Sequence, residues 1–311
     1  MQNIPMIEKL PLTLLLCTSL IWSEGPNADP APSAEAAASQ QDAVSAIDRR
    51  IVLESNTLNN PFVLTPHRPT YMLPATYTSK PNPTPFEPYD QQVTNWEIKG
   101  QISVKMQLER ELFGDNGYLY LAYTQKAHWQ AYNSRDSAPF RDTNHEPELF
   151  ITFLTNQRIL WLKNRLISFG INHQSNGRSG SLSRSWNRLF ADFVFERGNF
   201  YLDIKPWWRI PEQRKSSPTD TRGDDNEDIN DYMGYGEILA LYEMDQHRLG
   251  FVLRNNLQAE NKGAFQLDWS FPFRKRVRGY LQYFNGYGET LIDYNHSSSR
   301  IGLGIMIIDW L

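Results

Sequence analysis

The feature that most constrains the fold is a series of short segments, each alternating between polar and apolar residues, which runs from about residue 60 to the C-terminus. Such a pattern predicts β-strands with one polar and one apolar face. We identify twelve segments, each close to the ~9–11 residues that a tilted strand needs to cross a lipid bilayer. Their predicted starts are Tyr71, Trp96, Tyr118, Glu148, Leu160, Arg188, Phe200, Tyr235, Arg248, Ala264, Val277 and Arg300.

The connections between these segments alternate in length. Short turns are predicted at 114–117, 155–156, 196–199, 245–246 and 274–275, and longer segments at 78–95, 133–147, 174–187, 211–234, 255–263 and 286–299. Transmembrane barrels alternate in this way, with short periplasmic turns and long extracellular loops, whereas a sandwich has no reason to do so. The chain also ends in Trp310-Leu311, an apolar aromatic terminus typical of such barrels. We therefore predict an all-β fold, a twelve-stranded antiparallel transmembrane β-barrel of the outer membrane; a soluble all-β domain is the alternative.

Composition agrees with this fold. The 311-residue chain has a mean hydropathy of -0.54 and contains 9 Trp, 15 Tyr and 16 Phe. After the first 25 residues it has no apolar run of the roughly 18 residues that a membrane-spanning helix needs. In a barrel, lipid-facing and lumen-facing residues average to a polar mean, while aromatic girdles raise the Trp and Tyr content. The net charge of -4 gives no reason to expect a nucleic-acid partner.

The N-terminus is expected to be a processed leader. Lys9 precedes an apolar stretch from Leu10 to Trp22, which predicts a signal peptide over 1–23. Residues 24–55 are predicted to be disordered, because the region up to about residue 50 is rich in Ala, Ser, Pro and Gln, and 56–311 to form the barrel. Cys17, the single cysteine, would leave with the leader unless it is lipidated.

One pair of polar residues indicates hydrolytic chemistry. His173 and Ser175 are two positions apart, so on a strand their side chains share a face. Asn187 begins the next predicted strand, across the intervening loop, and can hold the far nitrogen of the imidazole. A serine becomes a good nucleophile when a neighbouring base takes its proton and a third group orients that base. An amide orients the ring but cannot offset the imidazolium charge as a carboxylate would.

Residue parity predicts which face carries these three residues. The odd positions that lead to the pair are Trp161, Lys163, Arg165, Ile167, Phe169 and Ile171, and those that follow Asn187 are Leu189, Ala191, Phe193 and Phe195. The even positions include Asn172, Gln174, Arg188, Asp192 and Glu196. Since the apolar face of a barrel meets lipid, all three candidates are expected on the lipid side at the outer rim. A lipid ester would be encountered there.

The string from Ile171 to Ser179, followed by Ser183-Arg184-Ser185-Trp186-Asn187-Arg188, resembles outer-membrane phospholipase A, a calcium-dependent serine hydrolase on a twelve-stranded barrel. The resemblance extends over most of the chain from about residue 95. Other segments that carry it are Thr124-Gln125-Lys126, 137–141, Lys205-Pro206-Trp207, 232–235 and 286–295.

The resemblance implies a role for each matching residue. Ser175 would be the nucleophile, His173 the general base and then acid, Asn187 the group that orients His173, and the Gly177 N–H an oxyanion donor. The calcium ligands would be the Arg178 carbonyl oxygen, the Ser183 hydroxyl and the Ser137 hydroxyl of a second subunit, all hard oxygen donors. Gln125 would be a dimer contact. The implied enzyme is a homodimeric outer-membrane phospholipase A1/A2 that also acts on lysophospholipids, with its active site toward the outer leaflet and Ca²⁺ as cofactor.

Two residues depart from the family pattern. Gly180 stands where the family can have an acidic residue, which puts a second calcium site in doubt. His145 stands where an aromatic residue is expected near the interface, and a histidine changes charge near neutral pH, so the dimer could be weaker or pH-sensitive. Phe140 fits either the dimer interface or an aromatic belt. The acidic stretch 213–231 is interpreted as a solvated external loop, with calcium binding as the alternative.

Two other functions remain open at this point. The first is a passive barrel, either a pore or a structural protein, in which inward polar residues fill a small lumen. The second is an enzyme on the same kind of barrel that removes acyl chains from lipopolysaccharide.

Overall fold

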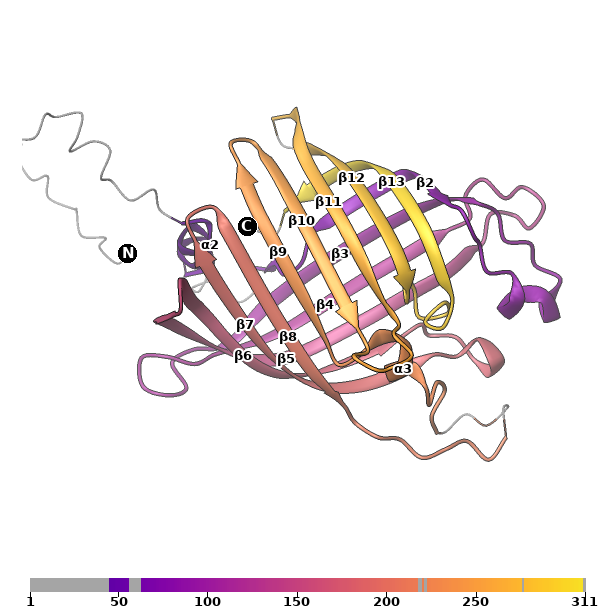
Figure 1. Ribbon diagram of the computed structural model, residues 1–311, viewed down its shortest axis with the longest axis horizontal. Coiled ribbons are helices and arrows are strands. Elements are labelled where there is room, and N and C mark those ends of the chain that lie inside the picture. The colour runs from indigo at the N-terminus through magenta and orange to yellow at the C-terminus, as the bar shows by residue number, and fades with distance from the viewer. Residues whose placement is uncertain (1–44, 56–62, 218–219, 221–222, 276, 310–311) are drawn as a thin grey trace, which may run out of the picture. The chain divides into compact units, whose positions relative to one another are not determined.

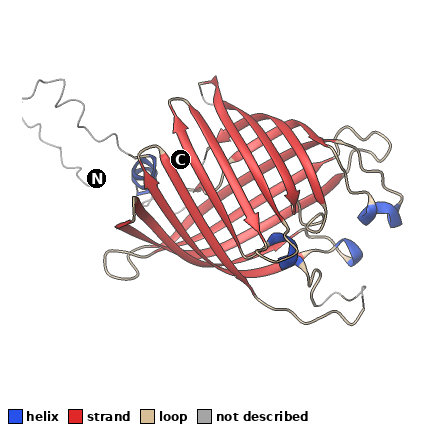
Figure 2. Ribbon diagram, in the orientation of Figure 1, coloured by secondary structure: helices blue, strands red, loops and turns tan. Residues whose placement is uncertain are grey.

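The chain is almost entirely β-structure, as the computed structural model shows for residues 45–55, 63–217, 220, 223–275 and 277–309 (Figures 1 and 2). The strands are β1 (Thr65–Pro66), β2 (Thr70–Thr78), β3 (Trp96–Glu109), β4 (Tyr118–Trp129), β5 (Phe140–Ile159), β6 (Leu162–Ser175), β7 (Ser185–Arg197), β8 (Phe200–Arg209), β9 (Gly236–Met244), β10 (His247–Asn255), β11 (Gly263–Arg274), β12 (Val277–Tyr287) and β13 (Ser297–Ile308). The helices are α2 (Ala46–Ser55), α3 (Ile229–Met233) and two 3₁₀ turns, η1 (Thr84–Tyr89) and η2 (Gly180–Leu182). Neither α-helix of these residues has the length and apolarity to span a bilayer.

Strands β2 to β13 form a closed antiparallel barrel of twelve strands. Each strand pairs with the next along the chain, and β13 returns to pair with β2, where Ile308 lies opposite Thr70. The first and last barrel strands therefore begin and end at the same rim, which is also the rim of the short turns (Figure 1). The predicted fold class, a twelve-stranded antiparallel barrel, is confirmed.

The predicted strand starts agree with the structure except in one hairpin. β5 begins at Phe140, not near Glu148, and β5 and β6 meet at residues 160–161 rather than at 155–156. The turn is made by Leu160, which has a positive φ of 56°. The polar residues between Thr155 and Arg158 suggested a turn, but they continue the strand beyond the apolar band.

The strands expose apolar side chains outward and bury polar ones inward. Phe169, Ile171 and Leu189 are 49%, 50% and 43% exposed, whereas the intervening Asn172 and Arg188 are buried. Alternation of this kind places an apolar surface against lipid. The odd–even prediction around the candidate site is therefore correct at these positions.

Arg165 is the exception to that parity. The pairing of β6 with β7 shifts register between Asn164 and Leu166, so both Asn164 and Arg165 are buried. Arg165 points into the lumen and pairs with Asp48 and Glu196. An extra residue at a β-bulge interrupts the alternation of faces, so Asn164 and Arg165 both face inward, and the placement of Arg165 on the lipid face was wrong.

Paired charges fill the lumen. The Glu97 carboxylate accepts one hydrogen bond of 2.5 Å from Arg141 and one of 2.5 Å from Arg300. The Lys99 ammonium donates a hydrogen bond of 2.5 Å to Glu289. All five side chains are at most 4% exposed. A second charged group consists of His67, Arg68, Glu146, Glu148, Arg188 and Lys205. The cavity beside the second group has a volume of only about 70 Å³, which argues against the pore alternative.

Replacing Glu97 with leucine is expected to destabilise the barrel by about 3–5 kcal/mol, because two buried guanidinium groups lose their carboxylate. The measurement is the denaturant midpoint of unfolding, followed by the heat-dependent gel mobility of the folded barrel. Glu109→Leu, at an exposed position on the same strand, is the matched control and should change stability by less than about 0.5 kcal/mol. Equal midpoints for the two variants would contradict the expectation.

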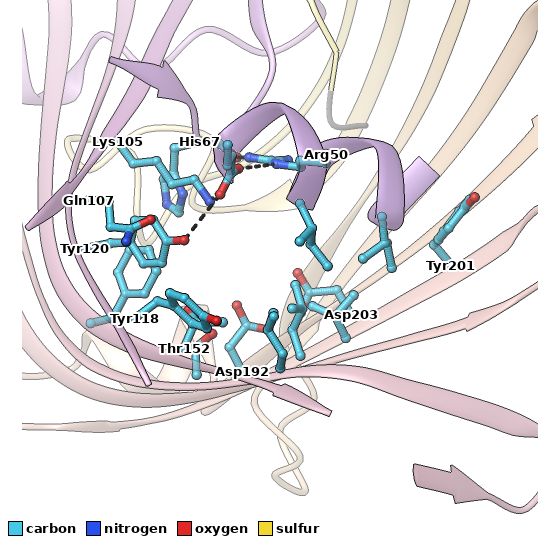
Figure 3. Close-up of a pocket in the computed structure, with 18 of the residues that line it drawn as sticks. Arg50, His67, Lys105, Gln107, Tyr118, Tyr120, Thr152, Asp192, Tyr201 and Asp203 are labelled. Atoms are coloured by element: carbon cyan, nitrogen blue, oxygen red, sulfur yellow. Dashed lines mark hydrogen bonds and ion pairs between the residues drawn. The ribbon is translucent and has the colours of Figure 1, made fainter. Parts of the chain in front are cut away.

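Helix α2 lies within the segment that was predicted to be disordered, and that prediction was wrong for Ala46–Ser55. The helix packs against the barrel interior. Glu54 forms an ion pair of 2.9 Å with Lys105, and the Ala46 N–H donates a hydrogen bond of 3.3 Å to the Tyr201 hydroxyl. It borders a cavity of about 420 Å³, which Figure 3 shows with Arg50 on one side and Asp192 and Asp203 on the other. The predicted signal peptide and the rest of the predicted disordered segment, up to residue 44, lie outside the described residues.

Candidate active site

The site lies where β6 ends and β7 begins, and its inward-facing neighbours fix its orientation. Trp186 is completely buried, and its indole N–H donates to Gln174 at 2.8 Å. The Arg188 guanidinium stacks over Trp186 at 4.1 Å and donates to Asn172 at 2.5 Å. Since these even-numbered side chains are held inside the barrel, the odd-numbered ones between them face outward.

His173, Ser175 and Asn187 occupy these outward positions. His173 is exposed, and Ser175 and Asn187 are partly exposed. His173 lies directly opposite Asn187 in the β6–β7 pairing, and its Nδ1 is 2.8 Å from Asn187 Oδ1. Ser175 follows two residues later on the same face; in the described residues, the His173 ring has its hydrogen bond to Asn187 and none to Ser175. None of the three lines the lumenal cavity.

A fourth residue, Glu212, joins this group from the loop after β8. The Asn187 Nδ2 donates to Glu212 Oε1 at 3.0 Å. A carboxylate only accepts hydrogen bonds, so the Asn187 NH₂ faces Glu212 and its Oδ1 faces His173. The Nδ1 of His173 therefore carries the hydrogen, and in the neutral ring Nε2 has a free lone pair. Sequence reasoning missed Glu212, although it shares the outward parity of the exposed Trp208.

Gly177 begins the loop and has a positive φ of 63°, a conformation that favours glycine. Its neighbours' N–H groups are occupied, since Asn176 donates to the Arg184 carbonyl and Arg178 to the Asn176 side chain. Among the described residues, the Gly177 N–H has no such acceptor. It is therefore available to a group bound beside Ser175.

Oxygen donors gather at the far end of the same loop. The Ser183 hydroxyl donates to Asp225 at 2.7 Å, and the Ser185 hydroxyl donates to the same carboxylate at 3.2 Å. Hydroxyl, carbonyl and carboxylate oxygens are the ligands that calcium prefers, so the donor set at Ser183 and Asp225 fits that ion. In the described part of the chain, no three His, Cys, Asp or Glu side chains form a metal cluster.

Two aspartates of the acidic stretch make close contacts with neighbouring side chains. Asp224 is held by Arg209 at 2.6 Å, and Asp228 accepts from the Tyr294 hydroxyl at 2.6 Å. Burial of the Tyr294 side chain raises its pKa, and the hydrogen bond of its hydroxyl to the Asp228 carboxylate raises it further. The interpretation of 213–231 as a solvated loop was therefore wrong for Asp224, whose side chain is 7% exposed, whereas Asp228 is exposed as that interpretation expects. The same contacts bring Asp225 to the active-site loop, a placement that sequence reasoning did not anticipate.

The residues expected at a subunit interface face outward next to the site. Gln125 lies opposite His145, and His145 in turn lies opposite Ser175. The Tyr123 hydroxyl is 2.7 Å from His145 Nδ1, so the unexpected histidine is tied to β4. Phe140 is 52% exposed and stacks on Trp129 at 5.4 Å. Ser137, in the loop before Phe140, has a positive φ of 57°.

Fold and site together define a class. The chain is a β-barrel whose outward-facing rim carries a serine, an imidazole anchored through Nδ1, and the Gly177 N–H, which has no acceptor among the described residues. Acyl transfer requires parts of this kind. Residues 47–307 match the Phospholipase A1 family. The phospholipase A1 of Klebsiella pneumoniae is 41% identical over 253 residues, covering 81% of this chain and 84% of the relative. That of Escherichia coli K12 is 40% identical, covering 81% and 83%.

Solved structures agree. Outer membrane phospholipase A from Escherichia coli superposes with a TM-score of 0.74 at 38% identity, covering 80% of this chain and 100% of that one. The outer membrane phospholipase of Salmonella typhi, solved as a dimer with bound calcium, gives a TM-score of 0.75 at 39% identity, covering 83% and 98%. The chain belongs to the phospholipase A1 family, and the resemblance to outer-membrane phospholipase A is confirmed. It is an outer-membrane phospholipase.

Proposed function

We propose that this phospholipase cleaves acyl esters through Ser175, His173 and Asn187, with calcium as cofactor and as a homodimer. The observation that carries the proposal is the 2.8 Å contact between His173 Nδ1 and Asn187 Oδ1 on the lipid-facing side, beside Ser175. An imidazole fixed through Nδ1 directs Nε2 to the neighbouring hydroxyl. A soluble substrate would not reach this face, whereas a membrane phospholipid would.

The chemistry proceeds in two steps. The Ser175 oxygen attacks the ester carbonyl carbon while its proton passes to His173 Nε2, and the carbonyl π electrons move to oxygen. The bond to the glycerol oxygen then breaks, and that oxygen leaves with the proton from His173. Water, deprotonated by the same nitrogen, cleaves the acyl-enzyme to release a fatty acid and regenerate Ser175.

The negative oxygen of each tetrahedral intermediate needs a donor. The Gly177 N–H is available for it, and one such donor is worth about a hundredfold or more in rate. Calcium would be held by the Arg178 carbonyl, the Ser183 hydroxyl and the hydroxyl of Ser137 of the partner subunit, with Asp225 beside Ser183. When bound, it supplies positive charge that polarises a water toward the same oxyanion.

A shared metal would couple activity to dimer formation, because neither subunit holds the full ligand set. Gln125, on the lipid-facing surface of β4, is the proposed contact between subunits. The Salmonella typhi relative, a dimer with bound calcium, supports this assembly. We further propose that both acyl positions of a phospholipid, and the remaining chain of a lysophospholipid, are hydrolysed.

Covalent labelling tests the proposal. A sulfonyl fluoride, added to the detergent-solubilised protein with calcium, is expected to modify Ser175 in preference to the other serines, because Ser175 lies two residues from His173, whose imidazole Asn187 orients. Peptide mapping identifies the serine, and chelation should slow the reaction. Modification of another serine, or retention of full activity after stoichiometric labelling of Ser175, would reject the assignment. Parallel assays with phospholipid and lipopolysaccharide decide the substrate class, and we expect fatty acid release from phospholipid.

A further inference from the structure

Glu212 lies behind the proposed triad, and nothing in the chemistry above uses it. We propose that Glu212 is a positioning residue that supplies, through Asn187, the negative charge that an asparagine lacks. This inference rests on the proposed function. It makes the site a four-residue chain from Ser175 through His173 and Asn187 to a carboxylate.

Strand register brings Glu212 to this place. β8 pairs with β7 so that Arg209 lies opposite Arg188, and the next residue, Ile210, donates its N–H to the Asn187 carbonyl at 2.8 Å. Glu212 follows two positions later, on the outward side that Trp208 also faces. Its side chain then reaches the Asn187 amide at 3.0 Å.

The contact has two consequences for His173. It removes the freedom of the Asn187 amide to flip, because an amide NH₂ can donate to the carboxylate and an amide oxygen cannot. It also polarises the amide, since hydrogen bonds in a chain strengthen one another and a charged acceptor strengthens them most. The Asn187 Oδ1 becomes a better acceptor while His173 carries the proton taken from Ser175. The effect therefore falls on the transition state rather than on substrate binding.

The first test removes the charge and keeps the shape. Glu212→Gln is expected to lower kcat about tenfold with KM unchanged, because the lost interaction strengthens only as the imidazolium forms. Glu212→Ala should lower kcat further, since the Asn187 amide then also loses the contact that fixes its orientation. Glu227→Gln, in the same loop but paired with the exposed Arg214, is the matched control and should keep full activity. Folding of every variant is checked by heat-dependent gel mobility.

The second test moves the negative charge from position 212 to position 187. Asn187→Asp places two carboxylates face to face and should cost about a hundredfold in kcat, since like charges at this distance cannot both remain ionised. Adding Glu212→Gln supplies an amide that donates to the new carboxylate, so the double variant should be at least about tenfold more active than Asn187→Asp alone. A merely structural role for Glu212 would make the two changes additive losses.

The outcomes separate this inference from the function on which it rests. Glu212→Gln within twofold of wild type, or a double variant no more active than Asn187→Asp, overturns the role of Glu212 while the triad remains. If Ser175→Ala in the same assay series keeps its activity, the proposed function falls, and the role of Glu212 with it. A tenfold loss of kcat together with rescue in the double variant establishes the role.

Discussion

Ser175→Ala is expected to abolish phospholipid hydrolysis, lowering kcat by roughly four to six orders of magnitude. Without the hydroxyl no acyl-enzyme forms, and His173 and the oxyanion donor act on water alone. The residue is outward-facing and its hydroxyl holds no structural contact among the described residues, so the barrel should fold as before. The measurement is fatty acid release from phospholipid in mixed micelles with calcium.

Ser179→Ala is the matched control for this variant, because Ser179 is an exposed serine four positions further along the chain, in the loop that follows β6. It should retain at least about half of the wild-type rate, as surface substitutions usually do. Unchanged activity in Ser175→Ala would remove the serine mechanism. Equal losses in both variants would indicate instead that the loop as a whole had been disturbed.

Removing calcium with a strong chelator is expected to lower activity at least about a hundredfold, because in the proposed mechanism the ion would polarise a water toward the oxyanion. Adding back calcium should restore the rate. Magnesium should restore much less, since it requires a smaller and more regular octahedral shell of oxygens. The measurement is initial rate against free metal concentration, together with sedimentation to follow the dimer.

Ser183→Ala should raise the calcium concentration needed for half-maximal activity by about tenfold, through loss of one oxygen ligand. Ser181→Ala is the matched control: Ser181 belongs to the same loop, but its hydroxyl contacts Tyr89 and not Asp225. Full activity in excess chelator would remove the ion from the proposed chemistry. An unchanged calcium requirement in Ser183→Ala would remove only this ligand.

Much of the molecule could be predicted from local pattern. Alternation with a period of two is a property of each strand alone, so it located all twelve barrel strands and placed His173, Ser175 and Asn187 on the lipid-facing side. The alternating loop lengths predicted which rim would carry the site. The errors also have local causes: a bulge at Arg165 interrupted the alternation at that one residue, and polar residues near Thr155 extended a strand instead of ending it.

Residue alternation and loop lengths were enough to predict the closed barrel, the rim that carries the long loops, and the outward trio of His173, Ser175 and Asn187, because these features depend on neighbouring residues. Only the tertiary structure brought Glu212 to Asn187, Asp225 to Ser183 and helix α2 to the lumen. These contacts join segments 25 to 155 residues apart. No periodicity encodes them, because they arise from the register of paired strands and the packing of loops and a helix against the barrel they form.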